Sequence, residues 1–208
     1  MQKGGITLKI IGLTGGSGAG KGEVCAILQK YGIPAVNTDA VYHALLETDA
    51  ALKNELTAAF GEDILENGSI SRARLAKSVF VGAGHADRLH TLNAITHKYI
   101  MARAWETVED FRRDGARAAV IDAPQLFEAG VDADCDILLG VIADPTLRTA
   151  RIVARDGISD AAAAQRIMSQ HDEGFYRSHC HYILENNGDT ATLELAVRRF
   201  LEESGLGL

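Results

Sequence analysis

The stretch IIGLTGGSGAGKGEV, residues 10–24, constrains the fold more than any other part of the sequence. An apolar run leads into clustered glycines with the spacing Gly15, four residues, Gly20 and Lys21. A strand that enters a helix through this spacing is typical of loops that bind nucleotide phosphates. Glycines let main-chain N–H groups surround a phosphate, while the helix N-terminus and the lysine supply positive charge. The alternative is a glycine-rich turn that only connects a strand to a helix.

Continuous apolar runs recur along the chain, as expected for strands that are covered on both faces of a sheet. They occupy residues 8–13, 33–36, 118–122, 137–143 and 182–184. Helical patterns lie between them at 20–31, 39–60 in two pieces, 72–81, 86–113, 145–155, 160–171 and 189–203. This alternation predicts right-handed crossovers, a parallel sheet and an α/β fold.

The length of 208 residues and a hydrophobic content of 47% favour a single domain, residues 1–208. No convincing strand is found within 39–113, so we interpret this stretch as a helical excursion that could hold a substrate.

Composition excludes several classes of protein. A net charge of −7 argues against a broad nucleic-acid surface. The N-terminus does not resemble a secretory signal, and no apolar stretch approaches the roughly 18–20 residues that a membrane span needs. Cys25, Cys135 and Cys180 are an odd set without metal-type spacing, which fits reduced thiols in a cytoplasmic protein. No catalytic role is expected for them.

Eight stretches together resemble the dephospho-coenzyme A kinase family over nearly the full length of the chain. They are IGLTGGSGAGKGEV, YGIPAVNTDAVYHALL, FGEDILENGSISRARLAKSVF, LNAITHKYI, VIDAPQLFEAG, RTARIVARDGIS, RIMSQ and YILENNGD. Only the first matches a general nucleotide-binding pattern, so the order and spacing of the others carry the resemblance. It implies a P-loop kinase fold with a helical substrate-binding insertion and an arginine-bearing lid at about residues 145–171. It also implies ATP and Mg²⁺ as cofactors.

The predicted ATP-binding residues include one departure from most phosphate loops. Gly22 occupies the position where a Ser or Thr usually ligates Mg²⁺, although adenylate-kinase-type loops also read Gly-Lys-Gly, and water can complete the shell of the ion. The carboxylate of Glu23 is expected either to turn away from the triphosphate or to help hold the metal through water. The predicted ATP-binding set is Gly16, Ser17, Gly18, Ala19, Gly20, Lys21, Gly22, Glu23, Arg151 and Arg155.

Two aspartates follow predicted strands, at the sheet edge where α/β proteins bind ligands. Asp39 could accept the proton of an attacking hydroxyl, or it could simply cap the next helix. The family carries a further aspartate two residues earlier, where this chain has Asn37. Asp122 could contact Mg²⁺ or its waters, or it could be a turn residue at the end of a strand.

Three arginines follow ADPTL at spacings of three and four, which places Arg148, Arg151 and Arg155 along one face of a helix. The resemblance suggests that such arginines close over ATP and neutralise charge on the transferred group. Arg148 stands where the family usually has glutamine, so Arg151 and Arg155 are the stronger candidates. The alternative is a solvated helix face that is paired with acids.

The remaining candidates are less constrained. His97 could meet phosphates of the coenzyme or cap a helix, and Glu128 could belong to a substrate loop or to the plain surface. The HCHY group at 179–182 lacks a set of partners for a metal site. Asn186 and Asn187 could edge the adenine pocket or form a turn, and the turn is the commoner case.

The resemblance therefore implies an enzyme that phosphorylates the ribose 3′-hydroxyl of dephospho-coenzyme A. The net charge and the lack of a long apolar stretch predict no nucleic-acid or membrane partner. Lys21, Asp39 and Arg151 would act in catalysis, and Asp39, His97, Asp122 and Glu128 would contact the acceptor. Gly22, Glu23 and Asn37 leave open a nucleotide-binding regulatory protein that has lost catalysis. A kinase of another small acceptor, such as a nucleoside monophosphate, is the third possibility.

Overall fold

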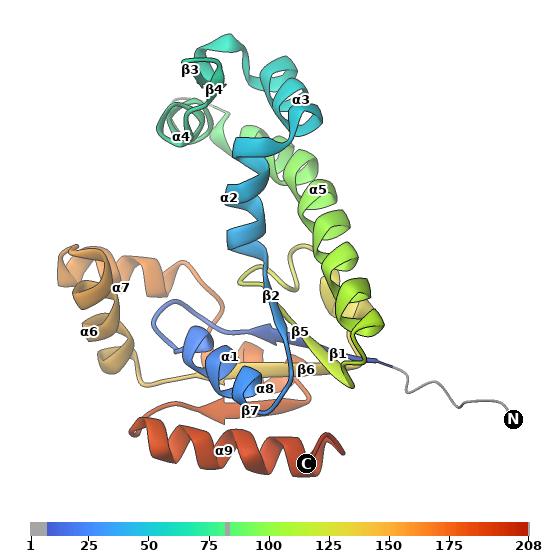
Figure 1. Ribbon diagram of the computed structural model, residues 1–208. Coiled ribbons are helices and arrows are strands. Elements are labelled where there is room, and N and C mark those ends of the chain that lie inside the picture. The colour runs from blue at the N-terminus through green and yellow to red at the C-terminus, as the bar shows by residue number, and fades with distance from the viewer. Residues whose placement is uncertain (1–7, 82–83, 208) are drawn as a thin grey trace, which may run out of the picture. The chain divides into compact units, whose positions relative to one another are not determined.

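A computed structural model describes residues 8–81 and 84–207. The chain divides into two compact units, whose elements are labelled in Figure 1. The sheet unit contains the described residues up to Val36 and those from Asp110 onward, and the helical unit is Asn37–Glu109. The helical unit is thus inserted in the sequence of the sheet unit.

Five strands form the sheet, in the order β2-β5-β1-β6-β7. Their bounds are β1 Lys9–Thr14, β2 Ala35–Asn37, β5 Ala118–Asp122, β6 Ile137–Ile142 and β7 Tyr182–Glu185. β1 pairs in parallel with β5 and β6, and β6 pairs in parallel with β7. The prediction of a parallel sheet is therefore confirmed. β1 is the central strand, so the loop that follows it leaves the middle of the sheet.

Two helices of the sheet unit, α1 (Lys21–Lys30) and α9 (Thr190–Glu203), share one core with the sheet. The buried side chains of this core include Ile11 and Leu139 from the strands, Ile27 from α1 and Val197 from α9. All four are at most 1% exposed. The remaining helices of this unit are α6 (Pro145–Asp156), α7 (Asp160–Met168), α8 (Glu173–His179) and the short 3₁₀ helix η2 (Val131–Asp134).

The helical unit has a separate core. Its elements are α2 (Thr38–Thr48), α3 (Ala50–Phe60), η1 (Glu62–Ile64), β3 (Leu65–Glu66), β4 (Ser69–Ile70), α4 (Arg72–Phe80) and much of α5 (His85–Arg113). Leu52, Leu56 and Ile64 are fully buried in this core. Each unit therefore has its own hydrophobic cluster.

The expectation that residues 39–113 contain no strand is wrong, because β3 and β4 form an antiparallel hairpin. Asn67 (φ 50°) and Gly68 (φ 79°) make its two-residue turn. Asn-Gly is the preferred pair for a hairpin turn with two positive φ angles. The signal is therefore present in ENGS, but each strand is only two residues long.

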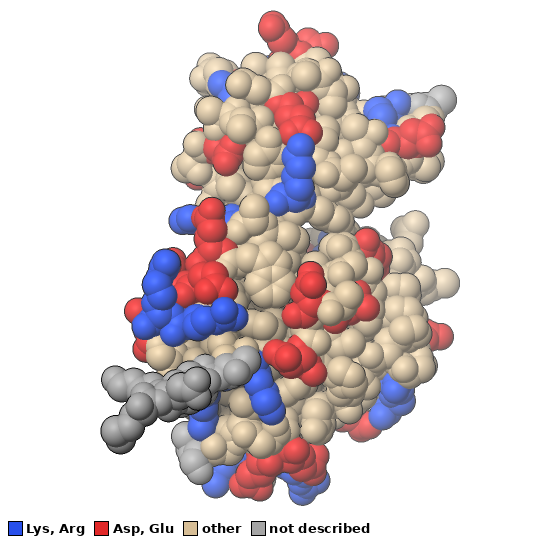
Figure 2. All heavy atoms as spheres, turned by 90° about the vertical axis from the view of Figure 1, so that its right-hand side faces the viewer, with Lys and Arg blue, Asp and Glu red and all other residues tan. Residues whose placement is uncertain are grey.

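The short helix α8 is not among the predicted elements, since the last helical pattern before β7 ends at residue 171. Asp172 starts α8 by accepting a hydrogen bond from the N–H of Phe175 at 2.8 Å. In the described part of the chain, no helix has the length and apolar character needed to cross a membrane. Acidic and basic side chains are interspersed on the face drawn in Figure 2.

Candidate nucleotide-binding site

The loop between β1 and α1 has the backbone of a phosphate-binding loop. Gly15, Gly18 and Gly20 have φ angles of 145°, 78° and 102°, which favour glycine. Gly20 is the N-cap of α1, and no side chain caps this helix. The first turn of α1 thus offers main-chain N–H groups and the positive end of the helix dipole to an anion.

Lys21 and Asp122 both lie near this loop. The ammonium of Lys21 donates to the carbonyl oxygen of Gly15 at 2.7 Å, so it lies over the loop. Burial, with a smaller effect from the Asp122 carboxylate, raises the pKa of the Cys25 thiol to about 12, and the Lys21 charge opposes this rise. Both charges therefore act at Cys25, one turn into α1. Asp122 is only 4% exposed at the end of β5.

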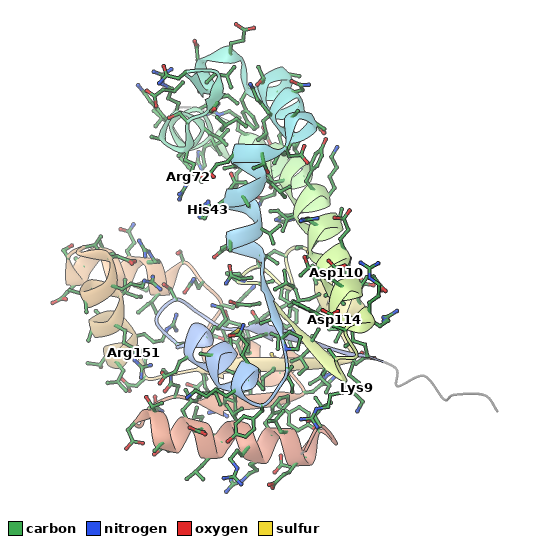
Figure 3. The ribbon with its side chains drawn as sticks, in the orientation of Figure 1. Lys9, His43, Arg72, Asp110, Asp114 and Arg151 are labelled. Atoms are coloured by element: carbon green, nitrogen blue, oxygen red, sulfur yellow. The ribbon has the colours of Figure 1, made fainter. Side chains whose placement is uncertain are left out.

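Three arginines of α6 contact the loop, as the sequence pattern predicted for one helix face. Arg151 donates to the carbonyl oxygens of Gly18 at 3.2 Å and Asn186 at 3.1 Å. Arg155 donates to the hydroxyl of Ser17 at 3.4 Å and pairs with Asp156 at 2.7 Å. Figure 3 labels Arg151 on α6. Only Arg155 of these two has a carboxylate partner within the described residues.

Arg148, the less favoured candidate in the sequence, is the most buried of the three at 8% exposed. Its Nε donates to the carbonyl oxygen of Ser17 at 2.9 Å, and its Nη2 donates to Oε1 of Gln170 at 3.0 Å. The same Oε1 accepts the N–H of Ser17 at 2.8 Å. Arg148 thus binds the carbonyl oxygen of Ser17, and Gln170 binds its N–H. Burial lowers the pKa of the Arg148 guanidinium from its ordinary value.

Asn186 is another loop contact that the sequence did not reveal. Its side chain is 2% exposed and donates to the carbonyl oxygen of Ala19 at 3.0 Å. Its own N–H donates to the carbonyl oxygen of Ile142 at 2.9 Å. Asn186 therefore ties the end of β7 to the phosphate loop. Asn186 therefore does not form the turn that the sequence favoured. Its alternative place at the edge of an adenine pocket stays a prediction.

Glu23 is turned toward α9, in agreement with the first of its two expected orientations. Its carboxylate accepts a hydrogen bond from the hydroxyl of Thr190 at 2.6 Å. Gly22 has open space around its Cα, because a Cβ added there would have no neighbouring atom within 4 Å. Neither residue supplies a hydroxyl at the position where most phosphate loops carry one.

Glu128 lies in the loop after β5 and is exposed. Its carboxylate is 3.1 Å from Nε2 of His171. His171 stacks on Phe175 with ring centroids 3.6 Å apart, and Phe175 stacks on His179 at 4.0 Å. Phe127 meets the edge of this stack. The Glu128 loop is therefore attached to the segment that follows Gln170.

Asp39 and Asn37 belong to the helical unit, where they begin α2. Asn37 is the N-cap, and its side chain accepts the N–H of Ala40 at 2.8 Å. The alternative that Asp39 caps this helix is therefore wrong. Asp39 is exposed in the first turn, where its negative charge suits the helix dipole.

His97 lies in the middle of α5, so the alternative that it caps a helix is also wrong. Lys98, the next residue, keeps a main-chain N–H and continues the helix. Its ammonium pairs with Glu55 at 2.6 Å, and Tyr99 donates to the same carboxylate at 2.9 Å.

The helical unit carries two further polar groups that the sequence did not single out, His43 and Arg72, labelled in Figure 3. Nδ1 of His43 is buried and has no hydrogen-bond partner among the described residues. Arg72 is exposed and forms no ion pair among the described residues. Burial raises the pKa of the Tyr42 hydroxyl, and the charge of Arg72 opposes this rise. Of these two groups, only Arg72 is exposed to solvent.

The thiols and the HCHY group have structural explanations. Burial raises the pKa of Cys135 to about 12 and that of Cys180 to about 11, so these thiols stay protonated at neutral pH. Nδ1 of His181 accepts the N–H of Leu138 at 2.9 Å, which extends the pairing between β6 and β7. Within the described residues, no group of three His, Cys, Asp or Glu side chains could hold a metal.

Residues 9–192 match the dephospho-CoA kinase family, CoaE. The chain belongs to this family. A dephospho-CoA kinase of Corynebacterium diphtheriae is 33% identical over 92% of this chain and 94% of the relative. One of Moorella thermoacetica is 35% identical over 93% of this chain and 91% of the relative.

Two solved structures have a similar fold over nearly the whole chain. The protein TT1252 from Thermus thermophilus has a TM-score of 0.78 and 31% identity, over 94% of this chain and 97% of that one. Dephospho-CoA kinase from Campylobacter jejuni has a TM-score of 0.68 at 21% identity, over 94% of this chain and 96% of that one, which shows the fold alone. The predicted fold class and family are therefore confirmed, and kinase membership implies the use of ATP.

Proposed function

We propose that this chain transfers the γ-phosphoryl group of ATP to the ribose 3′-hydroxyl of dephospho-CoA, giving CoA and ADP. The observation that carries the proposal is the match of residues 9–192 to the dephospho-CoA kinase family. The phosphate loop supports it, because left-handed glycines and an uncapped helix start provide the main-chain donors that a triphosphate needs. No observation favours a regulatory protein or another acceptor.

In the sheet unit, the loop amides and Lys21 would bind the β- and γ-phosphates. Arg151 donates to main-chain oxygens alone, so its charge is not neutralised by an acid among the described residues. Arg151, and Arg155 once it exchanges its bond to Asp156 for the ligand, would stabilise negative charge on the transferred group, which is where phosphoryl-transfer enzymes gain most of their rate.

The residues at the loop fit a Mg²⁺ ion that is bound mainly through phosphate oxygens and water. Asp122 is a buried carboxylate that lies opposite Leu13 of β1, one residue before the end of that strand, so it lies near the loop. A single carboxylate with several waters is a common way for proteins to bind this ion. Asp122 would hold it, through water, and when bound the ion would neutralise phosphate charge. Gly22 cannot contribute a hydroxyl.

The helical unit would bind the acceptor. Asp39 is exposed, and as a base it would accept the proton of the 3′-hydroxyl when that oxygen attacks the γ-phosphorus. His97 in this unit and Glu128 in the sheet unit are further acceptor contacts that we propose. Arg72 adds an exposed cation that forms no ion pair among the described residues, which suits the anionic groups of this substrate.

We also place the protein in the cytoplasm, where its three thiols would stay reduced and its partners are small molecules.

The experiment is a coupled assay of ADP release with ATP, Mg²⁺ and dephospho-CoA, run beside nucleoside monophosphates. We expect turnover that depends on dephospho-CoA. Asp39→Asn should lower kcat by about 10²–10⁴-fold, the range for loss of a general base. Glu47→Gln changes the other carboxylate of α2 in the same way and should leave kcat within about twofold.

Two results would contradict the proposal. Binding of ATP without turnover of any acceptor would indicate a protein that has lost catalysis, and turnover with a nucleoside monophosphate alone would identify another acceptor. Full activity of Asp39→Asn would remove this residue from its proposed role and leave the identity of the acceptor unaffected.

A further inference from the structure

Arg148 lies against the phosphate loop through both its side chain and its main chain. Its guanidinium bonds the carbonyl oxygen of Ser17 and shares Gln170 with the N–H of Ser17. A Cβ added at Gly16 would lie 2.1 Å from Nη2 of Arg148, and one at Gly18 would lie 2.6 Å from the Arg148 carbonyl oxygen. A side chain at Gly18 would therefore collide with the main chain of Arg148, and one at Gly16 would displace its guanidinium.

The charge of Arg148 is not neutralised by an acid. Its partners are a carbonyl oxygen and an amide oxygen, and it forms no salt bridge within the described residues. Arg155 on the same helix, in contrast, pairs with Asp156. A buried charge without a counter-ion is costly, and such charges are normally paired.

We propose that Arg148 is a positioning residue for nucleotide binding, which fixes the Ser17 residue through Gln170 and keeps one positive charge for the nucleotide phosphates to neutralise. The relevant counter-charge would then be the ligand itself. This inference rests on the proposed use of ATP, but it does not depend on which acceptor is phosphorylated.

Two substitutions separate the position of the guanidinium from its charge. Arg148→Gln removes the charge and places the residue that the family usually has at this position. Gln170→Glu keeps an oxygen that can accept from both Arg148 and Ser17, yet it gives the guanidinium a carboxylate partner. Arg199→Gln removes a charge from the exposed surface of α9 and serves as the matched control.

Each variant is measured in three ways. Calorimetric titration gives the Kd for ADP and for inorganic pyrophosphate, both without divalent ions. The ADP-release assay gives KM for ATP and kcat separately. Thermal unfolding gives Tm for the ligand-free protein and for the protein with saturating ADP.

We expect Arg148→Gln to raise Kd for ADP and KM for ATP by about tenfold or more, as loss of a charged hydrogen-bonding group would. The kcat should change by less than about threefold, since the group positions the loop and does not touch the reacting atoms. Gln170→Glu should keep or raise the Tm of the ligand-free protein, because it gives the buried guanidinium a counter-charge. The same substitution should weaken the binding of both ADP and pyrophosphate. The Tm increase caused by ADP should shrink in both variants.

A purely structural role predicts the reverse pattern. The inference is wrong if Arg148→Gln lowers the ligand-free Tm and leaves the Kd for ADP at the wild-type value. It is equally wrong if Gln170→Glu binds ADP as tightly as Arg199→Gln does. If Arg148→Gln does not fold, Gln170→Glu alone decides the question. Failure of acceptor turnover in the wild-type protein would contradict the proposed function, whereas these binding measurements would still stand.

Discussion

Gly18 and Gly22 lie four residues apart and differ in whether the structure could accommodate a side chain at their position. Gly18 has a φ of 78° and meets the main chain of α6. Gly22 lies inside α1, and a Cβ there would meet nothing within 4 Å. The two glycines therefore form a matched pair, in which only one is needed for the shape of the loop.

We predict that Gly18→Ala abolishes most nucleotide binding and destabilises the protein by about 1–3 kcal/mol, because alanine is strained at this φ and collides with Arg148. Gly22→Ala should be neutral or stabilise the protein by up to about 1 kcal/mol, since alanine favours a helix. Urea unfolding and ADP titration of both variants provide the measurement. Equal losses in the two variants would show that crowding at Gly18 has no effect.

For single residues, the sequence predicts a role only where the interacting partners lie close together in the chain. Gly15, Gly20 and Lys21 form one motif, so their shared role could be inferred from spacing alone. Arg148 bonds Ser17 across 131 residues, and Asn186 bonds Ala19 across 167. No local pattern reports such contacts, because they depend on where the sheet places α6 and the end of β7.

The same limit applies to the elements. Continuous apolar runs and long helical periods predict all five strands of the sheet and its main helices to within a few residues. The β3–β4 hairpin and α8 are too short for periodicity to detect, so only capping and turn residues mark them. The β3–β4 hairpin depends on the positive φ angles of Asn67 and Gly68, and α8 depends on the cap formed by Asp172. Such single residues give too weak a signal to predict an element.

α6 ends in an acidic residue, which the helix dipole disfavours at that terminus. Asp156 is the last residue of α6 and accepts hydrogen bonds from Arg155 in the same helix and Arg166 in α7. These two arginines lower the pKa of the Asp156 carboxyl to about 2. The acid therefore connects the two helices that follow β6.

The lowered pKa makes a prediction about acid stability. Because the folded-state pKa of Asp156 lies below its ordinary value of 3.8, its contribution is present above about pH 4 and is lost as the pH falls toward 2. Asp156→Asn should lower Tm at pH 5–7, and the two Tm curves should converge between pH 4 and 2. Parallel curves over this range would show that the carboxylate makes no stabilising contribution.

At the scale of the whole molecule, the sheet unit and the helical unit each have a hydrophobic core, and we propose that each unit binds a different ligand. Ile11 and Leu139 are buried in the sheet unit, whereas Leu52 and Leu56 are buried in the helical unit. The boundaries between the units in the sequence fall at Val36–Asn37 and at Glu109–Asp110, and the second boundary lies within α5. Each unit therefore buries its own set of apolar side chains.

We predict that the two ligands protect different amides from hydrogen exchange. ADP should slow exchange mainly at residues 15–24 of the sheet unit, because these amides would bind its phosphates. Dephospho-CoA alone should slow exchange mainly within residues 37–109. Mass spectrometry of peptic fragments after labelling would locate the protected segments. Protection of the helical unit by ADP and not by dephospho-CoA would contradict the proposed division.

The bond between Glu23 and Thr190 matters for anyone who alters the C-terminal end of this chain. Thr190 begins α9, so deleting this helix would remove the hydroxyl partner of the carboxylate and leave an uncompensated acid two residues after Lys21. The same deletion would also remove Val197 and Phe200 from the core of the sheet unit, so a shortened protein would lose stability as well as nucleotide affinity. Purification tags and fluorescent fusions are best attached beyond Gly207, because Leu206 is buried in the same core as α9.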